Sequence, residues 1–524
     1  MDALNRTVER LGLIEAGRLA IGGAPEGFDA LLLAALAKQG RQVVFVARDD
    51  VGLAKRADAL QFFAPALECL QFPAWDCLPY DRVSPRAELV SRRIDTLTRL
   101  LEPGVEQGDD QGDDNGRVIL TTVSALLQRV PPRQSFAGAT MALKPGQRLD
   151  PVALVAFLDR HGYRRADTVR EPGEYAQRGG IVDLYPAGAA DPLRLDFFGD
   201  ELEGLRAFGA ASQRTTGRLD AATVKPVSEV PLTEDAISRF RSRYRVLFGK
   251  AGDDDPLYGA VTAGHRHIGM EHWLPLFYDS LEALLDYMPG AAVVLDHQAE
   301  EARDARLDLI AEYYAARRDI AAGPMGAKGA GGAVYHPVPP DALFLDAREW
   351  KALLADRAVG VLSPFAAPEA IREGGDAADA GGRQGRDFAD VRVQPGANVF
   401  DALRDHVTAE RKRGRRVVIA AASDGSRDRL AAVLVEHGVE GLRPVAGWTE
   451  AAALDKSAVA LAVVALERGF VTDGLAVVTE QDILGDRLSR PARRRVRPEN
   501  FIAEASALSP GDLVVHVDHG IGRF

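Results

Sequence analysis

The sequence is poor in several features that define special protein classes. Its 524 residues include only two cysteines, Cys69 and Cys77. Two thiols are too few for a disulfide framework or a four-thiolate zinc site. Lysine supplies only 9 of the 64 basic residues, and the net charge is −12. This balance excludes a uniformly basic nucleic-acid coat protein, although it leaves room for a local basic patch.

Long hydrophobic runs are also missing. Even the longest apolar runs, such as 30–37, are far shorter than the about 20 residues that a membrane span needs. The first residues lack the basic and then apolar pattern of a signal peptide. We therefore expect a cytoplasmic, monomeric protein of several domains that contacts no membrane.

Strand and helix patterns alternate in the first part of the chain. Strands are predicted at 18–21, 42–47 and 117–121, and helices at 28–38 and 51–62. Ser124 is the expected N-cap of a further short helix. Alternation of this kind is typical of a mostly parallel sheet.

From about residue 135 the pattern changes to closely spaced short strands. They are predicted at 140–144, 163–169, 180–184, 193–198 and 201–208, with one helix at 151–161. This pattern indicates an antiparallel α+β domain inserted into the first one. Helix resumes after the N-cap candidate Thr233, and a buried strand is expected at 291–296.

Composition divides the rest of the chain. The segment 102–116 holds six acidic and no basic residues, and the segments 326–332 and 373–386 are rich in glycine. The predicted parts are an α/β domain at 1–134 continued at 231–345, an inserted domain at 135–230, a linker region at 346–397, a small α/β domain at 398–485, an Arg-rich linker at 486–509 and the start of a further domain at 510–524.

A glycine turn after the first strand occupies the position of a phosphate-binding loop. Gly22 and Gly27 have the G-x-x-x-x-G spacing, but Phe28 and Asp29 replace the Lys and Ser/Thr that would contact phosphate and Mg²⁺. A carboxylate at a helix N-terminus also repels an anion. The pattern favours a tight turn without nucleotide.

The Walker B position shows a similar departure. The apolar run before Asp296 resembles a Walker B strand, but His297 stands where an ATPase has a second acid. We find no metal-ligand spacing around His265, His267 and His272 or around His516, Asp518 and His519. We predict no catalytic residue, no metal site and no cofactor in this chain.

One strand combines arginine and phenylalanine. By alternation, Arg194, Asp196 and Phe198 share one face, whereas Phe197 points to the other. Arginine and an exposed aromatic side chain are the composition of a protein-binding hot spot. The alternative is an ordinary half-exposed sheet, and composition by itself favours it.

Six arginines cluster between residues 487 and 497, among them Arg493, Arg494 and Arg495. They are suited to contact DNA phosphates. A solvated interdomain linker is the competing interpretation, and it is the one we favour.

Several blocks of sequence resemble the bacterial transcription-repair coupling factor family. They are distributed over nearly the whole chain, at 72–93, 173–186, 194–201, 212–214, 269–277 and 511–524. The resemblance implies an α/β multidomain protein. Its first domain would be a degenerate P-loop domain of RecA-like or UvrB-like type, interrupted by the inserted antiparallel α+β domain and followed by the small α/β domain.

The family is a superfamily-2, ATP-dependent DNA translocase that displaces RNA polymerase stalled at a lesion and recruits the excision-repair protein UvrA. The resemblance implies that this chain is its N-terminal part, with a UvrB-like region that has lost ATPase activity. ATP, Mg²⁺ and double-stranded DNA would belong to motor domains, whose intact motifs do not occur here. The segment 510–524 resembles only the opening of the RNA-polymerase-binding domain.

The resemblance also gives residues a role. Arg178, Arg194 and Phe198 match family positions that bind UvrA, which reverses the preference for an ordinary sheet face. The expected function is an ATPase-inactive adaptor that recruits UvrA. The alternative is a UvrB-type, ATP-dependent DNA-binding repair protein that uses the loop 22–29.

Overall fold

The computed structural model describes residues 2–102, 116–249, 255–322, 335–366, 376–485, 513–516 and 520–523. Most of the acidic segment 102–116 and all of 326–332 and 486–509 lie outside these residues. The chain forms two compact units. The first comprises Met1–Gln384, Gly447–Ala452 and Phe470–Gly474, and the second comprises Gly385–Ala446, Ala453–Gly469 and Leu475–Phe524.

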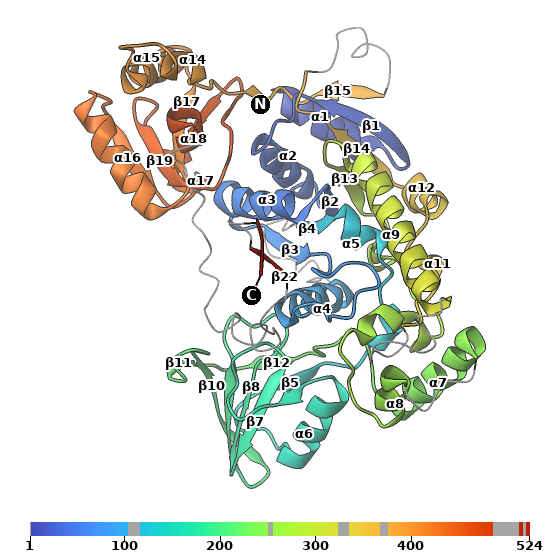
Figure 1. Ribbon diagram of the computed structural model, residues 1–524. Helices are drawn as coiled ribbons and strands as arrows, with labels where there is room; N and C mark the ends of the chain where they lie inside the picture. The colour runs from blue at the N-terminus through green and yellow to red at the C-terminus, as the bar shows by residue number, and fades with distance from the viewer. Residues whose placement is uncertain are drawn as a thin grey trace. The chain divides into compact units, whose positions relative to one another are not determined.

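A seven-stranded parallel sheet is the centre of the first unit (Figure 1). Its strand order is β15-β1-β14-β13-β2-β4-β3. All residues of β2 and β13 are buried, as expected for apolar strands covered on both faces. The strands are β1 (Gly17–Gly22), β2 (Val43–Ala47), β3 (Glu68–Phe72), β4 (Arg117–Thr122), β13 (Ala292–Leu295), β14 (Ala358–Leu362) and β15 (Ala377–Asp379).

Side chains cap some of the helices in this part. Asp49 accepts a hydrogen bond from the Gly52 N–H, and Thr122 accepts one from the Ala125 N–H. Thr122 therefore caps the short helix, and Ser124, the predicted cap, lies inside its first turn. The helices are α1 (Asp2–Leu13), α2 (Phe28–Ala37), α3 (Asp50–Phe63), α4 (Ala87–Leu101), α5 (Val123–Leu127), α9 (Ala299–Ala322), α11 (Pro340–Leu343) and α12 (Ala347–Ala355).

The structure differs from the sequence prediction over 346–397. That range was predicted as a linker region, but it contains α12 and the sheet strands β14 and β15. Strand β15 has three residues and pairs with β1, from Ala20↔Ala377 to Gly22↔Asp379. A strand this short carries no periodicity, so only its long-range partner defines it.

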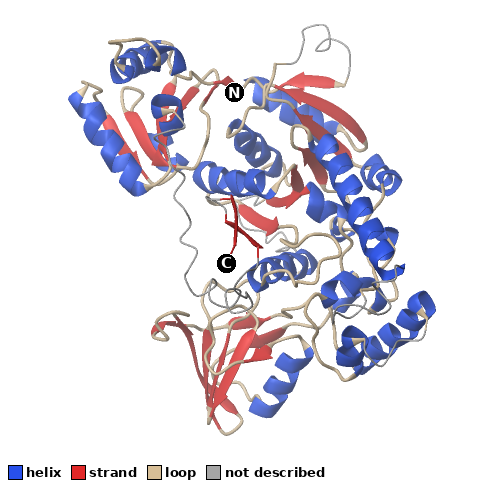
Figure 2. Ribbon diagram, in the orientation of Figure 1, coloured by secondary structure: helices blue, strands red, loops and turns tan. Residues whose placement is uncertain are grey.

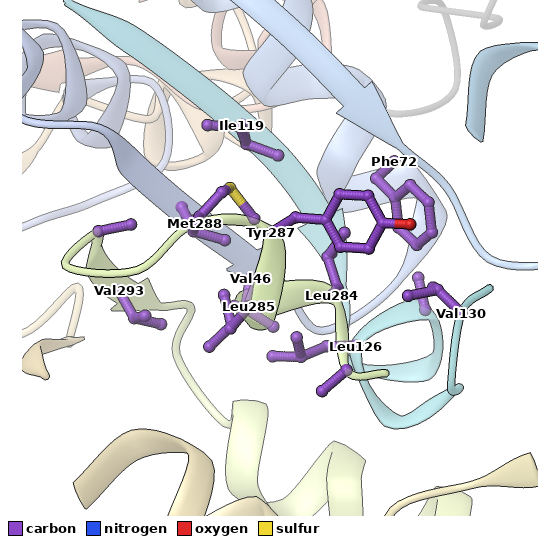
Figure 3. Packing of buried hydrophobic residues seen from close by; sticks show 14 of the residues in the cluster. Val46, Phe72, Ile119, Leu126, Val130, Leu284, Leu285, Tyr287, Met288 and Val293 are labelled. Carbon is purple, nitrogen blue, oxygen red and sulfur yellow. The ribbon is translucent and has the colours of Figure 1, made fainter. Parts of the chain in front are cut away.

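One hydrophobic core packs against the parallel sheet. In Figure 3, Leu285, Tyr287 and Met288 lie close to side chains of the strands, among them Val46 and Ile119. The three residues come from the 3-10 turn η3 (Leu284–Tyr287) and the residue after it. The Tyr287 hydroxyl donates to the Pro131 carbonyl at 2.7 Å, so this buried phenol has a hydrogen-bond partner.

The inserted domain is a second sheet with one helix on it (Figure 2). The strand order is β11-β10-β9-β8-β7-β6, antiparallel except for β6 with β7. Leu154 and Leu158 of the helix α6 (Pro151–Arg160) share a core with the sheet. The strands are β5 (Met141–Leu143), β6 (Arg164–Arg165), β7 (Glu174–Arg178), β8 (Ile181–Leu184), β9 (Leu193–Phe198), β10 (Glu201–Phe208), β11 (Thr215–Arg218) and β12 (Ala222–Val224), where β5 pairs with β12.

Helical segments follow the inserted domain. Thr233 caps α7 (Glu234–Phe248) by accepting from the Ala236 N–H, which confirms the predicted start. Phe240 of α7 stacks on Phe277, with ring centroids 4.8 Å apart. The other elements of the first unit are η1 (Arg133–Ser135), α8 (Pro256–Thr262), η2 (Met270–Leu276), β16 (Arg383–Gln384), α17 (Trp448–Ala453) and β20 (Phe470–Val471). The last residue of α17, Ala453, is assigned to the second unit. Strand β16 pairs with β20.

The second unit has a core of four parallel strands in the order β21-β17-β19-β18. Its elements are α14 (Ala389–Arg392), α15 (Val399–Lys412), β17 (Arg416–Ala421), α16 (Asp424–Glu436), β18 (Leu442–Val445), β19 (Val459–Val463), β21 (Leu475–Thr479), α18 (Glu480–Leu484) and the hairpin β22 (Leu513–His516) with β23 (Gly520–Arg523). Across the described residues of both units, no helix is long and apolar enough to span a membrane.

A buried ion pair joins the inserted domain to α4. Arg93 and Glu229 are both almost completely buried, and Nε of Arg93 lies 2.5 Å from Oε1 of Glu229. The guanidinium also donates to the Pro73 carbonyl at 2.9 Å and lies 4.1 Å from the Phe72 ring centroid. Loss of either partner would leave a buried charge without compensation.

We expect Arg93→Met to lower the free energy of unfolding by about 3–5 kcal/mol, because Glu229 would stay buried and unpaired. The control Arg18→Met removes an exposed pair with Glu300 and should cost at most about 1 kcal/mol. All four tryptophans belong to the first unit, so tryptophan fluorescence in urea reports on this unit. An equal loss of unfolding free energy in the two variants would contradict a stabilising role of the buried Arg93–Glu229 pair.

Candidate functional site

In the loop between β1 and α2, several backbone N–H groups are already hydrogen-bonded within the protein. Gly23 N donates to the Phe365 carbonyl at 2.7 Å, and Ala24 N donates to the Ser363 carbonyl at 3.0 Å. The N–H of Gly27 donates to the Asp29 carboxylate at 3.0 Å. A phosphate-binding loop needs such groups free to surround the anion. In this conformation the loop offers few donors to a phosphate.

The side chains at the end of the loop are buried as well. Phe28 and Asp29 are almost fully buried, and the Phe28 ring lies against Gly382, where a Cβ would meet it at 2.8 Å. Gly27 has φ 85°, a conformation that suits glycine at this helix N-cap. The loop is a packed turn, with an aromatic ring at the position where phosphate chemistry would need Lys.

One arginine connects the loop to the Walker B position. Arg56 of α3 donates to Asp29 at 2.8 Å and to Asp296 at 3.2 Å, and all three side chains are buried. Burial raises the pKa of Asp29 above its ordinary value, and the Arg56 guanidinium opposes that rise. Asp296 also accepts the His297 N–H at 2.8 Å. Asp296 stands at the position of the carboxylate that would bind Mg²⁺ in an ATPase, and here it pairs with the Arg56 guanidinium.

A pocket of about 350 Å³ lies beside this network, at the carboxyl ends of β1, β13 and β14. The described residues that line it include Asp296, Glu300 and Glu301 but no Lys or Arg. Polyphosphate sites need cations or free N–H donors. The charge of the pocket therefore opposes a nucleotide, although its position at the edge of a parallel sheet is where α/β proteins bind ligands.

His272 belongs to the group of neighbouring histidines at 265–272, for which the sequence predicts no metal site. His272 is buried beside Trp75, and its Nε2 lies 3.8 Å from Sγ of Cys77. Burial lowers the pKa of His272 to about 4. Among the residues that the structure describes, no group of three or more His, Cys, Asp or Glu side chains could hold a metal ion. Asp518 and His519 lie outside those residues.

The second candidate site is the face of the inserted sheet that points away from α6. We call it the outer sheet face, and it consists of Arg178, Ile181, Asp183, Arg194, Asp196, Phe198 and Arg206. The strand register places these residues on one side, since Arg178 pairs with Ile181, Ile181 with Asp196, and Asp183 with Arg194. Phe197 packs into the core on the opposite side, as alternation predicted.

Two hairpin turns bring three of these residues to one end of the sheet. Gly179, with φ 59°, follows Arg178, and Gly199, with φ 63°, follows Phe198. Phe198 is 75% exposed and Ile181 is 39% exposed. The exposed Arg178 donates to the Asp167 carbonyl. An apolar pair with an arginine beside it is thus presented to solvent at the turns.

Arg194 is held differently from Arg178. Its guanidinium makes a two-pronged ion pair with Asp183, at 2.7 and 2.8 Å, and lies 4.8 Å from the Phe208 ring centroid. Asp183 is almost fully buried. Arg206 similarly pairs with Asp196 at 2.6 Å. The two ion pairs therefore fix the positions of Arg194 and Arg206 on the sheet face.

Sequence reasoning missed Ile181, Asp183 and Arg206 on this face. A signal was present, because Gly179-Gly180 between two strands is a two-residue hairpin turn, and that turn fixes the register. Gly180 is also required by close approach, since a Cβ there would lie 2.7 Å from the Phe197 carbonyl oxygen. Arg493, Arg494 and Arg495 lie outside the described residues.

Comparisons with known proteins match both units. Residues 141–229 match the family model of the UvrB interaction domain, and residues 411–483 match the model described as MFD, D3 domain. The transcription-repair-coupling factor of Escherichia coli (strain K12) is 32% identical over 503 residues, which cover 94% of this chain and 41% of that protein. Over most of its length, this chain is similar to proteins of the transcription-repair-coupling factor family.

The family match extends to other bacteria. Relatives include the transcription-repair-coupling factors of Haemophilus influenzae, 27% identical over 96% of this chain, and Mycobacterium tuberculosis, 29% identical over 96% of it. The chain spans about two fifths of the length of these transcription-repair-coupling factors. It corresponds to their N-terminal portion, and the matched UvrB interaction domain contains the whole outer sheet face.

We expect Arg56→Met to lower the free energy of unfolding by about 3–5 kcal/mol at neutral pH, because Asp29 and Asp296 would be buried without a counter-ion. The loss should shrink at acidic pH. Without Arg56 the pKa of Asp29 rises further, so protonation removes its charge as the pH falls. Urea unfolding of variant and parent protein at two pH values measures this, and a loss independent of pH would contradict it.

Proposed function

We propose that this chain is the UvrA-recruiting part of a transcription-repair-coupling factor. It would act as an adaptor that brings UvrA to RNA polymerase stalled at DNA damage. One coincidence carries the proposal: the matched UvrB interaction domain holds an exposed apolar pair, Phe198 and Ile181, next to the exposed Arg178. Aromatic and arginine side chains dominate the binding energy of protein interfaces.

Each residue on the outer sheet face would have a separate role. Phe198 and Ile181 would bury apolar surface against UvrA, and Arg178 would pair with a carboxylate of UvrA. Arg194 would present its remaining N–H groups from the fixed pair with Asp183. Its planar fork is matched to carboxylates, which a lysine would imitate poorly.

The proposal includes the absence of ATP hydrolysis in this chain. The occupied N–H groups of the loop, the Asp29–Arg56–Asp296 network and the acidic pocket support it. ATP and Mg²⁺ would serve motor domains elsewhere in the full-length family, where they would drive translocation on double-stranded DNA. RNA polymerase would be a partner of the full-length family, and polymerase binding by this chain is not part of the proposal.

Binding of purified UvrA to the immobilised chain tests the surface. We expect Phe198→Ala and Arg178→Ala each to weaken affinity about 30-fold or more, as for hot-spot residues worth at least about 2 kcal/mol. Ile181→Ala should have a smaller effect because it is less exposed. The matched control is Val152→Ala, which is 71% exposed on α6, the element packed on the opposite side of the sheet, and should change affinity less than about two-fold.

Arg194→Ala needs a stability measurement beside it. Removal of Arg194 leaves the buried Asp183 without its partner, so the variant should weaken UvrA binding and also lower the melting temperature. Phe198→Ala and Arg178→Ala should leave the melting temperature nearly unchanged. Parent-like affinity in Arg178→Ala, Arg194→Ala and Phe198→Ala together would disprove the site.

Calorimetric titration with Mg·ATP distinguishes the adaptor from a UvrB-type ATP-dependent repair protein. We expect no binding, because the loop donors and the Asp296 carboxylate are already used inside the protein. Micromolar affinity would contradict the adaptor proposal and favour the ATP-dependent alternative.

A further inference from the structure

The end of α15 in the second unit carries a dense positive charge. Five of the six residues from Arg411 to Arg416 are Arg or Lys, in a chain whose net charge is −12. Gly414, with φ 80°, ends the helix, and the Arg415 N–H returns to the Glu410 carbonyl at 3.1 Å. We call the segment 411–416 the basic loop. Cations at a helix C-terminus are favoured by the helix dipole, but one or two suffice for that purpose.

A buried carboxylate fixes part of the basic loop. Glu410 is almost fully buried, and it accepts hydrogen bonds from both Arg413 and Arg415, the latter at 2.6 Å. Burial by itself would raise the pKa of Glu410, but the two guanidinium groups hold it below its ordinary value. The buried Glu410 therefore orients Arg413 and Arg415, while the Arg413 side chain remains 62% exposed.

The neighbouring loop adds to this charge. Arg416 donates to the Leu454 carbonyl at 2.7 Å, which brings the basic loop next to Asp455 and the exposed Lys456. Asp455 is the acid that faces Arg411 and Arg416. The basic loop, Glu410 and the neighbouring loop residues 454–456 together hold six basic and two acidic side chains, which is a net charge of +4.

The surroundings of the basic loop favour a phosphate backbone over an acidic protein. Protein interfaces rely on apolar or aromatic anchors. In the described part of this unit, the large apolar side chains that are exposed are Val393 and Val435, and neither lies in the two loops. Binding to a nucleic-acid backbone needs only positive charge and N–H donors, and arginine forks match phosphate oxygens.

We propose that the basic loop binds the phosphate backbone of nucleic acid without reading its sequence. Lys412 and Arg413 contact phosphates directly, and Glu410 is a positioning residue that holds Arg413 and Arg415. This surface is separate in sequence and in role from the outer sheet face, so the proposal does not depend on UvrA binding.

Fluorescence anisotropy with a labelled DNA duplex of arbitrary sequence tests the proposal on the whole chain, over a series of salt concentrations. We expect Lys412→Gln with Arg413→Gln to weaken binding and to reduce the slope of log affinity against log salt by about 2, since each lost phosphate contact removes about 0.9. A second variant, Arg411→Gln with Lys412→Gln, leaves both Glu410 ion pairs intact and should also weaken binding.

The matched control is Arg404→Gln with Arg427→Gln. Both arginines belong to the same unit and pair with local aspartates, so the control has the same change in net charge. We expect its DNA affinity to stay within about two-fold of the parent chain. Equal weakening in control and test variants would overturn the proposal, as would a parent chain without salt-dependent DNA binding. An acidic protein as the true partner would leave duplex binding unchanged in every variant, which also overturns it.

Discussion

The buried contact of Arg56 with Asp29 and Asp296 is the interaction on which the first unit depends. It joins the loop after β1, the helix α3 and the end of β13 at one edge of the parallel sheet. Two buried carboxylates at this edge would be costly without a cation between them. The Arg56 guanidinium supplies this cation, at 2.8 Å from Asp29 and 3.2 Å from Asp296.

The loop beside this contact is also held by hydrogen bonds within the protein. Since the loop N–H groups are bonded to carbonyls and a carboxylate, the turn after β1 packs as an interior element rather than as an anion cradle. Phe28 adds an apolar ring where a Lys would need solvent and phosphate. The parallel sheet with this packed turn is thus the scaffold that carries the inserted domain.

That surface depends on strand register. The hairpin at Gly179-Gly180 sets Arg178 opposite Ile181, and the pairing of β8 with β9 then aligns Asp183 with Arg194. A shift by one residue would turn every one of these side chains into the core. The bidentate Asp183–Arg194 pair and the Arg93–Glu229 pair both use a carboxylate to fix an arginine, one at the surface and one in the interior. Glu410 repeats the arrangement in the second unit.

The sequence by itself determined the α/β class, the inserted antiparallel domain and the resemblance to the family, because apolar periodicity, glycine turns and long sequence blocks are local signals. It also determined that Phe198 and Phe197 lie on opposite faces of the sheet, since alternation along one strand needs no partner. Only the tertiary structure placed β14 and β15 in the central sheet and Arg56 between two aspartates. These features depend on contacts between residues far apart in the chain, such as Arg56 with Asp296, and no local pattern of a single sequence records them.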